Sequence, residues 1–105
     1  MKLTLADLRR EADGLLDRGE PLAALRAYLS IVKRVPEDHG SRQAIGDALA
    51  RGGSLDEAAR VYQATAQLCI DGGHPFAACV AIFALEALER PEAKERGRAL
   101  RRQLI

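Results

Sequence analysis

The chain has 105 residues, enough for one domain with a modest hydrophobic core. Its 16 basic and 15 acidic residues nearly balance, which argues against a protein built mainly to bind nucleic acid or an anionic membrane. Alanine and leucine dominate the apolar residues and runs of β-branched residues are scarce, so the composition favours helices over strands.

Helix-breaking residues divide the chain into six segments, each long enough for several helical turns. The breaks fall at Arg18–Pro21, Val35–Ser41, Arg51–Ser54, Asp71–Pro75 and Glu89–Glu92. Within the segments, apolar residues recur three or four positions apart, the spacing of one face of an α-helix. The sequence therefore predicts an all-α fold of about six helices.

Several helix starts are marked by capping residues. Thr4 stands three residues before Asp7, and Ser54 stands three residues before Glu57, so both pairs fit the capping-box pattern. Proline is favoured at the first position of a helix, where its missing N–H costs nothing, and it follows a break three times, at Pro21, Pro75 and Pro91.

The last two segments differ in character. The fifth, Phe76 to Leu88, is apolar on nearly every side, which predicts a helix buried on most sides. The sixth is rich in basic residues and has one apolar stripe, formed by Ala93, Gly97, Leu100 and Leu104. Because no polar capping helix follows this stripe, we expect either a homodimer through the sixth helix or a chain that is the N-terminal part of a larger protein.

The first two helix pairs align when the chain is shifted by 34 residues. Ala12 then falls on Gly46, a small residue on a small residue. Six positions are identical in the two copies: Asp13 and Asp47, Leu15 and Leu49, Gly19 and Gly53, Ala24 and Ala58, Arg26 and Arg60, and Tyr28 and Tyr62.

This pattern resembles the tetratricopeptide repeat, a helix–turn–helix unit with a period of 34 residues. The family has a small residue within the first helix, glycine near the turn, alanine early in the second helix and an aromatic one turn later, and both units match. Pro36 matches the proline that closes a unit, whereas Ile70 stands in its place in the second. The early aromatic is replaced by Leu8 and Arg42, and the third unit aligns only loosely.

The resemblance implies one domain over residues 1–105 that binds a protein or peptide without catalysis. In the family, the first helix of each unit lines a concave surface. By that resemblance the partner-binding residues are Arg9, Asp13, Asp17, Gln43, Asp47, Arg51, Ala77 and Ala81, with Ala84 beside them. This set lacks the Lys/Asn clamp with which some family members hold a C-terminal carboxylate. It suits a partner with a basic end and an apolar end.

Asp13 and Asp47 stand out within this set. Both lie in mid-helix, where aspartate is unfavourable, and they occupy equivalent positions in the two units. Since neither position calls for a cap, we expect the two side chains to face the same surface and to contact a basic segment of the partner.

The sequence contains no pattern typical of an enzyme or a cofactor site. The glycine pairs lack the Lys-Ser/Thr sequence of a phosphate-binding loop, and no cysteines have zinc-ligand spacing. Cys69 and Cys79 are expected to be buried, reduced thiols, and His39 and His74 to be solvated or capping turn residues; a metal site of Cys69, His74 and Cys79 is the alternative.

Charge appears too early for a signal peptide, and the longest uncharged stretch, Gly72–Leu85, is too short to cross a bilayer, so we expect a cytoplasmic protein without membrane contact. The first alternative function is an oligomerisation or adaptor domain of a larger bacterial regulatory protein. The second is nucleic-acid binding through the basic residues between Arg90 and Arg102, which have no aromatic residues among them to stack on bases.

Overall fold

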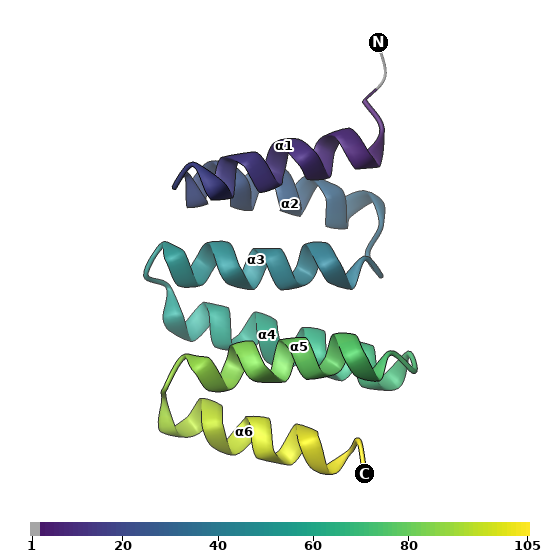
Figure 1. The fold of residues 1–105 in the computed structure, drawn as a ribbon, viewed down its shortest axis with the longest axis vertical. Coiled ribbons are helices and arrows are strands. Elements are labelled where there is room, and N and C mark those ends of the chain that lie inside the picture. Colours follow the sequence, from purple (N-terminus) through teal and green to yellow (C-terminus); the bar gives the residue numbers. More distant parts are fainter. Residues whose placement is uncertain (1–2) are drawn as a thin grey trace.

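The computed structural model describes residues 3–105, and within this range the chain forms six α-helices and no β-strand (Figure 1). The prediction of an all-α fold is therefore confirmed. The helices are α1 (Leu5–Asp17), α2 (Pro21–Arg34), α3 (His39–Arg51), α4 (Leu55–Asp71), α5 (Pro75–Ala87) and α6 (Pro91–Arg102).

The helix starts follow the predicted capping residues with one exception. Thr4 and Asp7 form a reciprocal capping box, in which each backbone N–H donates to the other side chain at 3.1 Å. The three prolines occupy the first turn of α2, α5 and α6. Ser54 takes the N-cap position of α4, but its side chain caps no backbone N–H, so the capping box predicted there is absent.

Glycine ends three of the helices, as its ability to adopt positive φ angles allows. Gly19, Gly53 and Gly73 have φ angles of +75°, +87° and +75°. In each case the next residue donates its backbone N–H five residues back, as in the bond from His74 to the Cys69 carbonyl at 2.8 Å. These turns reverse the chain sharply, so the two helices that each turn joins lie antiparallel.

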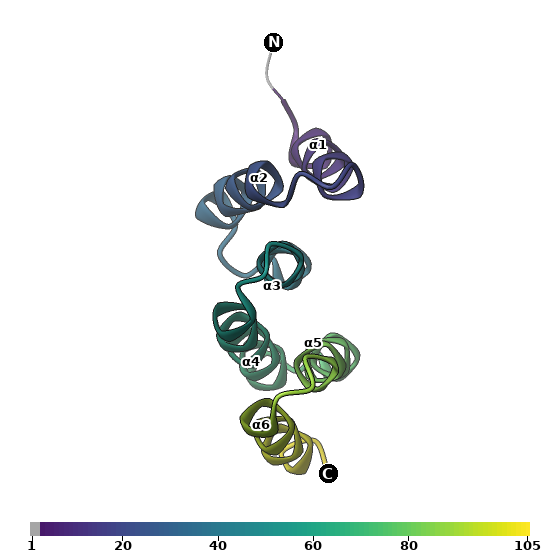
Figure 2. The same cartoon turned by 90° about the vertical axis from the view of Figure 1, so that its left-hand side faces the viewer.

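The helices stack in chain order and form two layers. Figure 2 shows α1, α3 and α5 in one layer and α2, α4 and α6 in the other, and each helix packs against the next. The stack measures 46 × 29 × 17 Å. In the first layer α3 is set back from α1 and α5, so the outer side of this layer is concave. We call the surface formed by the outward sides of α1, α3 and α5 the concave face.

The spacing of the helices changes along the chain. α3 begins at His39 and α1 at Leu5, a spacing of 34 residues, whereas α5 begins at Pro75, 36 residues after His39. The reason is that α4 has 17 residues while α2 has 14, and this extra length exceeds the one residue by which the following connection is shorter. The third helix pair therefore follows a different register from the first two.

The core consists of two clusters. One lies among α1, α2 and α3 and contains Ala24, Tyr28 and Ile31; the other lies among α4, α5 and α6 and contains Ala58, Tyr62 and Leu85. Ala24 and Ala58 are fully buried at equivalent positions, as expected of small residues where helices approach closely.

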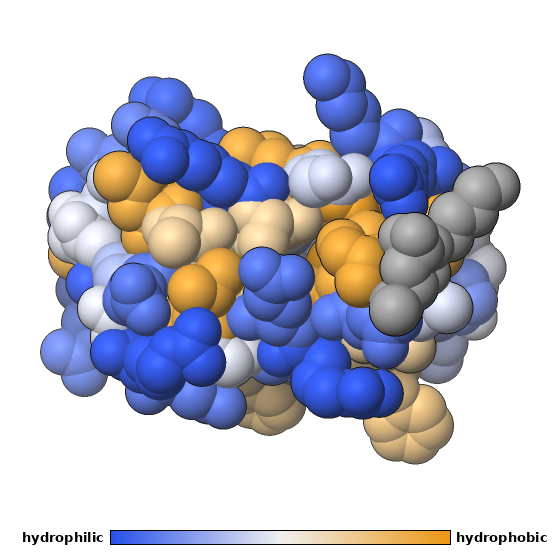
Figure 3. All heavy atoms as spheres, turned by 90° about the horizontal axis from the view of Figure 1, so that it is seen from above, coloured by the Kyte–Doolittle hydropathy of each residue, from blue (hydrophilic) through white to orange (hydrophobic). Residues whose placement is uncertain are grey.

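The two ends of the stack differ in how far their apolar residues are covered. At one end, the stripe of α6 is covered within the chain, because Ala93, Gly97 and Leu100 are buried. Viewed from the opposite end, Figure 3 shows apolar side chains in the middle of the surface over α1 and α2, inside a hydrophilic rim.

Within residues 3–105, no helix combines the length and the apolar character that crossing a bilayer requires.

Candidate functional site

The concave face carries most of the residues predicted to bind a partner. Arg9, Asp13, Asp17 and Arg51 are exposed, and Gln43 and Asp47 are partly buried. The two alanines predicted on α5 differ in burial. Ala77 is partly buried at the surface, whereas Ala81 is fully buried and lines no binding surface. Ala84 is also partly buried and packs against the second core cluster. The prediction for Ala81 was wrong because it assumed a 34-residue spacing up to α5.

An apolar stripe takes the place of those alanines on α5. Phe76, Val80 and Phe83 are 89%, 54% and 65% exposed, and their spacing of four and three residues puts them on one side of the helix. The prediction that this helix is buried on most sides is therefore wrong for one side. The chain has only two phenylalanines, and both are on this stripe.

Arg101 on α6 contacts one end of the stripe. Its guanidinium carbon lies 5.5 Å from the centre of the Phe83 ring, within the range of a cation–π interaction, and the same group pairs with Glu86 at 2.5 Å. These contacts hold Phe83 in place without covering it. The stripe was not predicted from the sequence. The signal that could have revealed it is the pair of phenylalanines seven residues apart, in a helix whose first turns have no polar residues.

A first hollow of about 310 Å³ lies between α1 and α3 on the concave face, and most of the residues that line it are polar. Arg9 pairs with Asp38 at 2.5 Å, and the Ser41 hydroxyl donates to the same carboxylate at 2.8 Å. Partial burial disfavours the charged carboxylate, but the hydrogen bonds from Ser41 and Arg9 outweigh it and hold the pKa of Asp38 below its ordinary value. The charge of Arg9 is thus engaged within the protein.

Asp13 and Asp47 each accept a hydrogen bond from a tyrosine of the following helix. The Tyr28 hydroxyl donates to Asp13, and the Tyr62 hydroxyl donates to Asp47 at 2.5 Å. Burial and these hydrogen bonds raise the pKa of both tyrosines well above the ordinary value. The structure therefore gives a structural reason for aspartate in mid-helix, where the sequence had suggested only a functional one.

Negative charge gathers where α1 and α3 meet. The carboxylates of Asp13, Asp17 and Asp47 all lie close enough to Tyr28 to raise the pKa of its hydroxyl. Of the two predicted cations, Arg9 is paired with Asp38, and Arg51 donates to the backbone carbonyl of Leu16 at 3.2 Å. Because the tyrosine hydroxyls are neutral donors, they bring no positive charge to these carboxylates, and this part of the concave face favours a cation.

A second hollow of about 170 Å³ lies between α3 and α5, with two residues of α4 contributing to its lining. The residues around it are mainly small or apolar: His39, Gly40, Gln43, Thr65, Cys69, Ala77 and Val80. The side-chain oxygen of Gln43 is buried and accepts no hydrogen bond from any residue in the described range. The Thr65 hydroxyl does not donate to this oxygen, because it donates to the Val61 carbonyl at 2.7 Å.

The two hollows are neighbours. Gly40 lines both of them, and Val80 belongs both to the second hollow and to the apolar stripe. A polar region beside α1 is thus connected through α3 to an apolar region on α5.

The alternative of a metal site formed by Cys69, His74 and Cys79 is not supported. Residues 3–105 contain no group of three or more His, Cys, Asp or Glu side chains placed to hold a metal ion. Both cysteines are free; Cys69 is buried, and this burial raises the pKa of its thiol, whereas Cys79 is partly exposed, contrary to prediction. The rings of His39 and His74 contact each other, with their centres 5.1 Å apart.

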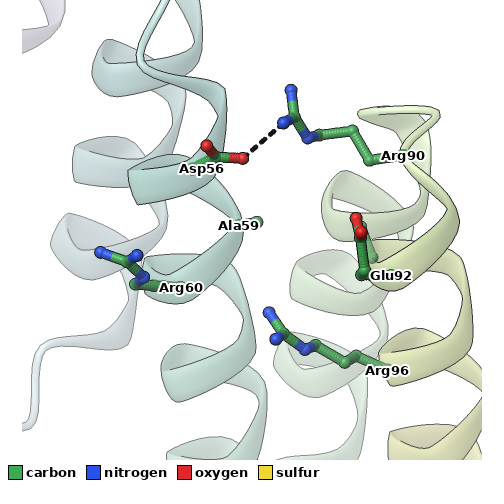
Figure 4. A pocket seen from close by; sticks show the side chains of 7 residues that line it. Asp56, Ala59, Arg60, Arg90, Glu92 and Arg96 are labelled. Carbon is green, nitrogen blue, oxygen red and sulfur yellow. Dashed lines mark ion pairs between the residues drawn. The ribbon is translucent and has the colours of Figure 1, made fainter.

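The other side of the molecule has a charged hollow of about 340 Å³ between α4 and α6. Figure 4 shows acidic and basic side chains interleaved around it, with Arg90 paired to Asp56 at 2.6 Å. Arg101, further along the same basic segment, is held by Glu86. These pairs engage part of the positive charge on which the nucleic-acid alternative depends.

No family model, curated protein or solved structure matches the chain.

Proposed function

We propose that the protein is an interaction module of the tetratricopeptide type, which binds a peptide or helix of another protein on its concave face and performs no chemistry. The observation that carries the proposal is the exposure of Phe76, Val80 and Phe83 on α5. Large exposed apolar side chains in a row are typical of interaction surfaces, and aromatic residues dominate the energetics of many of them.

The negative charge on the concave face indicates that one end of the partner segment is basic. The carboxylates of Asp13, Asp17 and Asp47 lie at the α1–α3 end of the concave face, while the apolar stripe lies on α5. A complementary segment carries basic residues at one end and apolar residues at the other. We also place this activity in the cytoplasm, following the expectation from the sequence.

Selection from a library of short random peptides displayed on phage tests the proposal. The wild-type protein is expected to enrich peptides that combine lysine or arginine with apolar residues. The variant F76S/F83S should lose these peptides while keeping its helical circular-dichroism spectrum, because both side chains are exposed. The matched control is L22S/L29S, which removes two similarly exposed apolar residues from α2 in the other layer. Equal binding by F76S/F83S and the wild type would contradict the proposal.

The oligomerisation alternative is favoured by a separate observation, the exposure of Leu22 and Leu29 on α2. If these residues join two copies of the chain, light scattering shows a mass that rises with concentration in the wild type and not in L22S/L29S. A constant monomer mass for both proteins excludes this alternative.

A further inference from the structure

We propose that the second hollow, between α3 and α5, is the anchor site for one aliphatic side chain of a bound peptide, and that a backbone N–H of the peptide donates to the side-chain oxygen of Gln43. This inference rests on the proposed function, because it names the position and the chemistry of the central contact.

The size and lining of the hollow suit one apolar group. Its volume of about 170 Å³ is close to the roughly 150 Å³ of an apolar cavity that takes up a benzene-sized molecule. Gly40, Ala77 and Val80 contribute no charge to its walls, and the buried thiol of Cys69 behaves as a small apolar group. An aliphatic side chain fits these walls better than a charged one.

Gln43 provides the polar part of the site. Its buried oxygen lacks a hydrogen-bond donor within residues 3–105, and an acceptor left in this condition destabilises a fold. Every peptide carries backbone N–H groups beside its side chains, so an aliphatic residue that enters the hollow brings a donor with it. The residue thus fills the hollow and, once the Gln43 amide turns toward it, also satisfies the oxygen, which no solvent reaches in the unbound protein.

The residues around the hollow favour a peptide with basic residues next to the anchor. Gly40 connects the hollow to the polar hollow that Asp13 lines, and Asp47 lies one helical turn from Gln43 on α3. On the other side, Val80 connects the hollow to the exposed ring of Phe76 on the same helix face. A peptide anchored here therefore contacts carboxylates on one side and the apolar stripe on the other.

A small probe tests the anchor site directly. N-acetyl-leucine methylamide carries one aliphatic side chain between two peptide N–H groups, and its titration is followed by the amide shifts of the isotope-labelled protein. We expect the largest shifts at Gly40, Thr65 and Ala77, and no comparable shifts with N-acetyl-glycine methylamide. Shifts that map elsewhere, or equal effects of the two probes, would overturn the assignment.

Variants separate filling of the hollow from loss of the fold. Ala77→Leu fills it from α5 and Gly40→Leu from α3, and each is expected to weaken probe binding by at least about tenfold. The matched control, Ala87→Leu, adds the same atoms at an exposed position of α5 that does not line the hollow and should leave binding unchanged. Unchanged probe binding by both filled variants contradicts the inference.

Gln43→Met tests the hydrogen bond. Methionine has a similar shape but no acceptor to leave unsatisfied, so the melting temperature should stay the same or rise while probe binding weakens about tenfold. If binding by Gln43→Met equals that of the wild type, Gln43 is not part of the site.

The outcomes also separate this inference from the proposed function. Library peptides that require Phe76 and Phe83 but bind Ala77→Leu and Gly40→Leu like the wild type would overturn the anchor site and leave the proposed function intact. If the probe occupies the hollow but the library peptides bind F76S/F83S like the wild type, the anchor site stands and the proposed function is overturned.

Discussion

Asp47 and Tyr62 show how one residue pair shapes both the interior and the surface. Gly46 allows the Tyr62 ring to lie directly on α3, because a Cβ atom at this glycine would come within 2.4 Å of the ring. In that position the tyrosine hydroxyl reaches Asp47, whose partly buried carboxylate stays at the concave face. Tyr28 and Asp13 repeat this bond in the first unit. The fold thus fixes two of the charges that the proposed partner meets.

Removal of the acceptor should destabilise the protein. Tyr62 is only 3% exposed as a residue, and Asp47→Ala leaves its hydroxyl without an acceptor. We expect a loss of about 1–2 kcal/mol in the free energy of unfolding. Urea denaturation measures this loss. The control is Asp17→Ala, at an exposed position, where we expect a change within about 0.5 kcal/mol.

A double-mutant cycle isolates the bond. Because Tyr62→Phe removes the hydroxyl, the combination with Asp47→Ala should cost less than the sum of the two single changes. Strict additivity would show that the hydrogen bond contributes nothing to stability.

At the scale of the elements, one turn departs from the rule that the others follow. Gly19, Gly53 and Gly73 end their helices with positive φ angles, but the residue in the corresponding position after α5 is Glu89, with a φ angle of +56°. A residue with a side chain is strained there, since its Cβ approaches the following carbonyl oxygen.

Replacement of this residue should therefore stabilise the protein. Glu89→Gly is expected to raise the free energy of unfolding by about 0.5–1 kcal/mol, the relief of strain less the greater flexibility of glycine in the unfolded chain. Thermal melting or urea denaturation measures the change. The reverse control is Gly73→Ala, where a new Cβ meets no atom within 4 Å, so that only the backbone penalty of about 1 kcal/mol remains. Destabilisation by Glu89→Gly would show that the turn is not strained.

The helices could be predicted from the sequence more fully than the surface could. Prolines, glycines and apolar spacing are local signals, and they locate all six helices of the described range. The concave face depends on register, which adds up over the lengths of all preceding elements. A net shift of two residues before α5 was enough to place the predicted Ala81 in the core and Phe76 at the surface.

Other features of the site could not be predicted from any local pattern. The hydrogen bonds from Tyr28 and Tyr62 and the burial of the Gln43 oxygen depend on how neighbouring helices pack. The 34-residue identities showed that these tyrosines and aspartates correspond between units, but not that they contact each other.

At the scale of the whole molecule, the two core clusters meet at Leu49. This side chain packs against both clusters, the one among α1, α2 and α3 and the one among α4, α5 and α6. In a stack where each helix contacts mainly its neighbours, cooperativity depends on such shared contacts.

Truncation of this residue should uncouple the two halves as well as destabilise them. Leu49→Ala is expected to cost about 2 kcal/mol, near the lower end for a leucine because the side chain is only partly buried. Hydrogen exchange should then show α1 and α2 opening more readily than α4 and α5, because the halves no longer unfold together. The matched control is Leu88→Ala, a partly buried leucine that packs against the second cluster alone; it should destabilise without separating the two halves. If Leu49→Ala instead accelerates exchange equally in all four helices, the clusters are coupled through other contacts and Leu49 is not the junction.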